Sequence, residues 1–164
     1  MKKNSIIILS IFISYNSFTQ IILFDDDWRF HRGDFRNGER KNINEGNWRK
    51  IDLPHDFSIE DLPGLSSPFN RDALNGPSAG FTTGGTGWYR KSFTIPVRLR
   101  NKKMMIQFDG VYMNADVWLN GEHLGNHPYG YTSFYYDITR KIKAGEKNVL
   151  AVQVKNHGAT SRWY

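Results

Sequence analysis

The stretch that decides the fold is residues 104–139, MMIQFDGVYMNADVWLNGEHLGNHPYGYTSFYYDIT. In residues 104–109, and again in residues 114–120, side chains alternate with a period of two, which is typical of half-buried strands. Asn120-Gly121 is the preferred pair for a two-residue turn, so the chain is expected to fold back after it. Residues 133–138 add an aromatic-rich extended segment. This pattern predicts the middle of an antiparallel β-sandwich.

The rest of the chain predicts short strands joined by turns. Further strands are expected around residues 28–30, 48–53, 88–95 and 148–155. In the third of these, Tyr89, Phe93 and Ile95 face one way and Arg90, Ser92 and Thr94 the other. Residues 57–87 show no periodicity and contain three prolines, so they are expected to form a long irregular loop. About eight strands are needed to close a jelly roll, and roughly seven are expected here, so the sandwich is predicted to be incomplete at its C-terminus.

Composition and the N-terminus limit the classes of function. The net charge is +6, without a basic block, which argues against a nucleic-acid-binding surface. Lys2 and Lys3 precede an apolar run of about eight residues, which is too short to span a membrane. We therefore interpret residues 1–20 as a signal peptide, cleaved near Thr19 or Gln20, and expect a periplasmic or extracellular protein. The chain has no cysteine, so neither disulfides nor a lipoprotein anchor can form.

Several motifs together resemble the N-terminal sugar-binding domain of glycoside hydrolase family 2. They are FDGV at 108–111, VWLNGEHLG at 117–125, GYTSFYYDIT at 130–139, LPHDFSIE at 53–60, TGWYRKSF at 86–93 and SRWY at 161–164. The resemblance covers roughly residues 21–164 and implies one jelly-roll, galactose-binding-domain-like unit. The PYGY string at 128–131 and the LPHD string resemble the β-galactosidase branch more than the glucuronidase or mannosidase branches.

The resemblance also implies which chemistry is missing. A retaining glycosidase needs two carboxyl groups about 5 to 5.5 Å apart. In the family both catalytic glutamates lie in a (β/α)₈ barrel that follows this domain, so no catalytic residue is assigned and the chain alone is expected to be inactive. No cofactor is expected. His123 and His127 are four residues apart, but in an expected hairpin and without a third ligand, so no metal site is predicted.

Sugar contacts are the chemistry that remains. Arg162 and Trp163 pair a polar fork with an aromatic face, and in the family this segment borders the mouth of the active site. His55 and Asp56 are a second candidate pair, although a structural turn capped by Asp56 is the favoured interpretation of these two residues. Arg71, in the long loop, is a third candidate. Trp88, Trp118 and Trp163 are expected near a surface that meets the next domain.

Three interpretations follow from these residues. The first is the N-terminal domain of an exported β-galactosidase-like enzyme, whose partners are a β-galactoside and the remaining domains of the parent. The second is a free-standing, lectin-like carbohydrate-binding module. The third is an inactive gene fragment. The resemblance leaves open the glycoside specificity and whether the parent assembles as a homo-oligomer.

Overall fold

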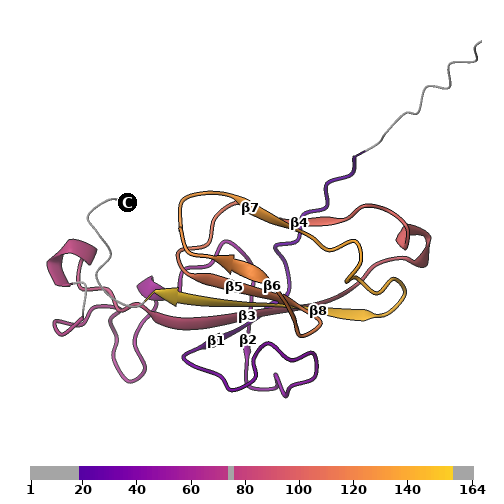
Figure 1. The fold of residues 1–164 in the computed structure, drawn as a ribbon. Coiled ribbons are helices and arrows are strands. Elements are labelled where there is room, and N and C mark those ends of the chain that lie inside the picture. Colours follow the sequence, from indigo (N-terminus) through magenta and orange to yellow (C-terminus); the bar gives the residue numbers. More distant parts are fainter. Residues whose placement is uncertain (1–18, 74–75, 157–164) are drawn as a thin grey trace, which may run out of the picture.

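The computed structural model describes residues 19–73 and 76–156, and within them the chain is all-β (Figure 1). Its strands are β1 (Trp28–Arg32), β2 (Arg49–Ile51), β3 (Gly85–Thr94), β4 (Met105–Phe108), β5 (Ala115–Leu119), β6 (Glu122–His127), β7 (Phe134–Asp137) and β8 (Lys147–Asn156). The described residues also form three short 3₁₀ helices, η1 (Phe57–Ile59), η2 (Gly76–Ala79) and η3 (Val97–Leu99). No helix in the described part of the chain is long and apolar enough to cross a membrane.

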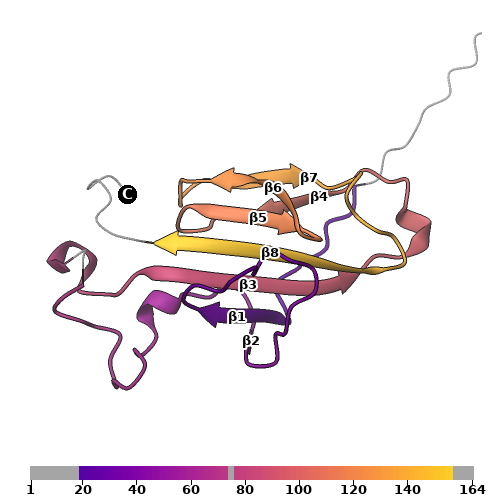
Figure 2. The same ribbon diagram turned by 60° about the horizontal axis from the view of Figure 1, so that its bottom comes forward.

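The strands form two antiparallel sheets, as the alternation in residues 104–139 predicts. One sheet has the order β2-β1-β3-β8-β5-β6, and the other consists of β4 and β7. β3 and β8 pair over ten residues, from Gly85 opposite Asn156 to Thr94 opposite Lys147. Figure 2 shows these two long strands running side by side through the middle of the larger sheet. The prediction of an antiparallel sandwich is therefore confirmed.

The core lies between the two sheets. Phe30, Tyr89, Val152 and Val117 are opposite one another on neighbouring strands and share the inward face of the larger sheet. Phe134 of β7 closes the core from the other side. The predicted inward faces of β5 and β8 are confirmed, because Ala115, Val117, Leu119, Leu150, Val152 and Val154 are all at most 4% exposed.

The long loop between β2 and β3 is more ordered than the sequence suggests. It contains η1 and η2, and an isolated bridge joins Phe69 to Thr82. β3 begins at Gly85, three residues before the predicted start, because the backbone of the glycine-rich segment pairs with the end of β8. A side chain could not be accommodated there: a Cβ at Gly84 would collide with the carbonyl oxygen of Asn156.

The outward face of β3 is covered by the loop of residues 33–48. Arg90 has no exposed surface, and its guanidinium donates to the carbonyl oxygens of Gly38, Arg40 (2.9 Å) and Lys41 (3.2 Å) and to the Glu45 carboxylate (2.8 Å). Five donors in a planar fork suit this arrangement, because one side chain satisfies several loop acceptors at once. Arg90 therefore anchors the loop to the sheet.

Two tryptophans pack on this same outward face. Trp88 is 3% exposed and stacks on Trp118, with ring centroids 5.4 Å apart. Gly38 of the covering loop lies against the Trp88 ring, where any Cβ would come within 2.9 Å of it. The expectation that Trp88 belongs to an exposed inter-domain surface is therefore wrong, because the loop of residues 33–48 already covers it. Trp163 lies outside the described residues.

We expect Arg90→Met to release the loop of residues 33–48. The substitution keeps the bulk of the side chain but leaves three carbonyl groups and the half-buried Glu45 carboxylate without their donor, which should cost about 3 kcal/mol of unfolding free energy. Urea unfolding measures the loss, and amide hydrogen exchange should quicken in residues 35–47 first. Arg98→Met, at an exposed arginine in η3, is the matched control. Equal stability of the two variants would contradict the anchoring role.

Candidate functional site

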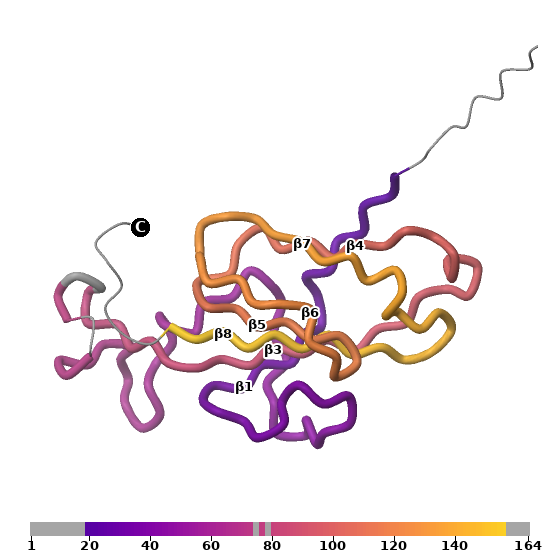
Figure 3. The backbone as a smooth tube through the Cα atoms, viewed as in Figure 1, coloured from indigo at the N-terminus to yellow at the C-terminus, as the bar shows by residue number. Residues whose placement is uncertain are grey.

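One end of the sandwich gathers most of its irregular loops. β1 ends, β3 begins and β8 ends at the same side, as the pairs Arg32–Gly87 and Gly85–Asn156 require. The β2–β3 loop leaves β2 at the other end but reaches β3 here, and the β4–β5 and β6–β7 loops lie here as well. Figure 3 follows the backbone through these loops, on the left of the view, next to the end of β8. We call this side the loop end of the sandwich.

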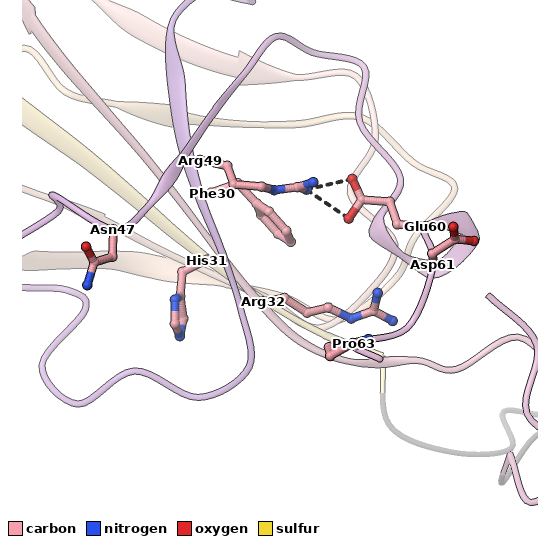
Figure 4. Close-up of a pocket in the computed structure, with 8 residues that line it drawn as sticks. All are labelled: Phe30, His31, Arg32, Asn47, Arg49, Glu60, Asp61 and Pro63. Atoms are coloured by element: carbon pink, nitrogen blue, oxygen red, sulfur yellow. Dashed lines mark hydrogen bonds and ion pairs between the residues drawn. The ribbon is translucent and has the colours of Figure 1, made fainter. Parts of the chain in front are cut away.

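A pocket of about 230 Å³ opens at the loop end, beside the final residues of β1. It is lined by Phe30, His31, Arg32, Asn47, Arg49, Glu60, Asp61 and Pro63. The first three of these residues are in β1. Arg49 is in β2 and Asn47 lies just before that strand, and the last three residues follow η1. Figure 4 shows the guanidinium of Arg49 pointing at the Glu60 carboxylate across the Phe30 ring. The polar lining is balanced, with two arginines and two carboxylates.

A chain of hydrogen bonds ties one wall of the pocket to the core. Arg49 donates to both carboxylate oxygens of Glu60, at 2.6 and 2.8 Å. Nε2 of His55 lies 2.9 Å from the same carboxylate, and Nδ1 of His55 lies 2.9 Å from the hydroxyl of Tyr89. A carboxylate accepts only, so Nε2 carries the hydrogen, and in neutral histidine Nδ1 then accepts from Tyr89. The network therefore holds Glu60 in a defined position at the pocket.

The electrostatics of the network favour this same arrangement. Partial burial acts to raise the pKa of Glu60, but the hydrogen bonds from Arg49 and His55 outweigh it and hold that pKa below its ordinary value. Burial, together with the nearby charges of Asp56 and Glu60, raises the pKa of the Tyr89 hydroxyl well above its usual range. Glu60 therefore stays an anion and Tyr89 stays a neutral donor at physiological pH.

The predicted sugar-contact residues that the structure describes lie in three different settings. His55 lies behind the pocket, and its ring is held between Glu60 and Tyr89. Asp56 caps η1, accepting from the backbone N–H of Ser58 at 2.8 Å and from its hydroxyl at 2.7 Å. Arg71 is exposed in a turn of the β2–β3 loop. Arg162 and Trp163 lie outside the described residues, so sugar contact by these five residues stays a prediction.

The lining of the pocket was missed by the sequence reasoning. Arg32, Arg49, Glu60 and Asp61 come from three separate segments, and only the pairing of β1 with β2 and β3 brings them together. One signal was available: Glu60 ends the LPHDFSIE string, within reach of the predicted candidate His55. The partner of that carboxylate, Arg49, could not be found without the register of β2.

The two histidines of the β5–β6 hairpin make separate contacts. Nε2 of His123 lies 3.0 Å from the Asp116 carboxylate, and the His127 ring stacks on Phe134. Among the described residues no group of three histidine, aspartate or glutamate side chains is placed to hold a metal ion.

Comparisons with known proteins identify one family of glycoside hydrolases. Residues 25–163 match the family described as glycosyl hydrolases family 2, sugar binding domain. The β-galactosidase BoGH2A of Bacteroides ovatus is 45% identical over 86% of this chain, which is 16% of its own length. A putative β-glucuronidase of Formosa agariphila is 39% identical over the same share, 13% of its own length.

Solved structures show the same fold. A glycosyl hydrolase family 2 member from Bacteroides cellulosilyticus superimposes with a TM-score of 0.83 at 52% identity, covering 86% of this chain and 18% of that chain. A β-glycosidase from Bacteroides vulgatus gives 0.76 at 42% identity, again over 86% of this chain and 18% of the other. The chain thus spans less than a fifth of the length of these similar proteins.

The low pKa of Glu60 predicts a pH dependence. Because the folded state holds this pKa below the unfolded value of 4.5, the stabilisation is complete above that value and is lost as pH falls through the folded pKa. Glu60→Gln should remove about 1 kcal/mol or less near neutral pH, since Arg49 is partly exposed, and almost nothing near pH 3. Urea midpoints at both pH values measure this. A difference between variant and parent that stays the same at both pH values would contradict the assignment.

Proposed function

The chain belongs to glycosyl hydrolase family 2 as its sugar-binding domain, and on that premise we propose that it serves an exported enzyme acting on β-galactosides. In this proposal the domain supplies polar walls for a sugar and a surface for the rest of the enzyme. The catalytic pair of carboxyl groups then belongs to the remaining domains, since the similar enzymes are more than five times as long as the matched region.

The pocket at the loop end is the observation that carries the sugar assignment. Its carboxylates and guanidinium groups can accept from and donate to sugar hydroxyls. Glu60 already accepts from Arg49, so this arginine is largely neutralised. With two positive and two negative groups the lining carries no net charge, which supports a neutral hexose in this proposal.

Arg32 is the arginine best placed to contact such a sugar. Its guanidinium is not paired with a carboxylate among the described residues; it donates to the Thr83 hydroxyl at 3.1 Å and lies 5.6 Å from the centre of the Phe57 ring. In this proposal Arg71, Arg162 and Trp163 add further sugar contacts, and His55 and Asp56 position the wall of the pocket.

We expect the 164-residue chain to bind methyl β-galactoside more tightly than methyl β-glucuronide. Amide shifts in residues 30–32, 47–49 and 60–63 should report the binding in an NMR titration. Arg32→Met should weaken the affinity for galactoside about tenfold, by removing a charged hydrogen-bond donor. Arg98→Met, far from the pocket, should leave it unchanged.

Two outcomes bear directly on this proposal. Tighter binding of the glucuronide would replace the galactoside assignment with a uronide one. Hydrolysis of a nitrophenyl β-galactoside by the purified chain, lost on substitution within it, would show that the carboxylates needed for the reaction lie in this domain.

Export is proposed from the sequence alone. Lys2, Lys3 and the short apolar run that follows them support a cleaved signal peptide. N-terminal sequencing of the protein from its native host should therefore find a start near residue 20. A cytoplasmic protein that retains Met1 would contradict export.

A further inference from the structure

Three tyrosines gather on the surface at the loop end, away from the pocket. Tyr112 is in the β4–β5 loop, and Tyr129 and Tyr131 are in the β6–β7 loop. They are 40%, 50% and 57% exposed. The ring centroid of Tyr131 lies 5.4 Å from that of Tyr112 and 5.9 Å from that of Tyr129. We call these three side chains the tyrosine surface.

The backbone holds the tyrosine surface in a defined shape. The backbone N–H of Asn114 donates to the carbonyl oxygen of Pro128 at 3.2 Å, which joins the two loops. Lys155 of β8 donates its N–H to the carbonyl oxygen of Met113 at 3.0 Å, which joins the first loop to the large sheet. Gly130 lies directly against Tyr112, and a Cβ there would be 2.8 Å from Cγ of the tyrosine. These backbone contacts fix the two loops, so little entropy should be lost when a ligand binds the rings.

The two segments that carry the tyrosine surface contain almost no charge. Residues 109–115 and 128–134 contain one charged side chain, Asp109, which accepts from the side-chain amide of Gln107 at 2.9 Å. The other polar groups are hydroxyls and amides. Aromatic rings present flat faces to the C–H side of a sugar ring, and tyrosine hydroxyls add hydrogen bonds at the rim. A neutral, hydroxyl-rich ligand matches this chemistry.

Other exposed hydrophobic side chains differ from the tyrosines in their chemistry. Ile59, Leu65 and Phe69 of the β2–β3 loop are 56 to 65% exposed and carry no polar atoms in their side chains. Such a group suits contact with another protein surface, where apolar area is buried dry. The tyrosine surface keeps a hydroxyl on every ring, and this chemistry favours a sugar over a protein as its ligand.

We propose that the tyrosine surface is a second carbohydrate-binding site, which stacks sugar units of a neutral oligosaccharide beyond the unit held in the pocket. The inference rests on the proposed function, because both sites lie at the loop end of the same sandwich. The pocket lies beside β1 and β2, whereas the tyrosines lie beside the β4–β7 pair. A single sugar unit therefore cannot occupy both sites. An oligosaccharide of several units can contact both, so its affinity should be higher than that of a single unit.

The test measures how tightly the full 164-residue protein binds oligosaccharides of different lengths. A β-linked galacto-oligosaccharide of four units should bind at least about tenfold more tightly than methyl β-galactoside, and the tyrosine ring signals should shift in ¹H–¹³C NMR spectra. Tyr131→Ala and Tyr129→Ala should remove this gain while leaving the affinity for methyl β-galactoside unchanged. Tyr135→Ala is the matched control, because Tyr135 is 65% exposed on β7 but takes part in none of these ring pairs.

A positioning variant adds an independent readout. Gly130→Ala leaves all three tyrosines in the sequence but displaces the Tyr112 ring, so it should also reduce the gain from chain length. Unchanged melting temperatures for the tyrosine variants exclude unfolding as the cause. Oligosaccharide binding that is no tighter than monosaccharide binding, or that survives all three variants, would overturn the inference while leaving the pocket assignment standing. Oligosaccharide shifts confined to the tyrosine surface would support the inference and overturn the pocket.

Discussion

The pairing of β3 with β8 is the constraint on which the rest of the structure depends. Ten consecutive residue pairs set the register of the large sheet, and β1 and β5 add to it on either side. That register fixes where β1, β3, β5 and β8 begin and end along the sheet. The loop after β1, the loop before β3 and the loop before β5 therefore lie at the same end. Both the pocket and the tyrosine surface contain residues of the loops that gather at this end.

Polar side chains then convert this frame into a shaped surface. Arg90 holds one loop on the outward face, and the chain Arg49–Glu60–His55–Tyr89 holds another at the pocket. Each network runs from a partly exposed group to a residue buried in the sheet. A buried polar group that lost its partner would cost the fold free energy, so the loops are kept in one arrangement. That rigidity reduces the entropy lost when a sugar binds.

Local patterns predicted the fold well and the candidate site only in part. Alternation in residues 104–109 and 114–120, and the Asn120-Gly121 turn, identified the sandwich because strand period and turn chemistry are local properties. Trp88 was misjudged because its covering loop is held by Arg90, whose loop acceptors lie 45 or more residues away in the sequence. Arg32 and Arg49 were missed for the same reason, since they meet Glu60 and Asp61 only through strand register. Asp56 illustrates the converse: its capping role was visible in the sequence.

We propose that sugars bind this domain at its loop end. A spin-labelled β-galactoside, added to the isotope-labelled chain, measures this directly through paramagnetic broadening of amide signals. We expect broadening in residues 30–32, 60–63 and 129–131, and sharp signals in residues 96–103 and 140–146 at the opposite end. Broadening centred on residues 96–103 or 140–146, with the loop end unaffected, would contradict it.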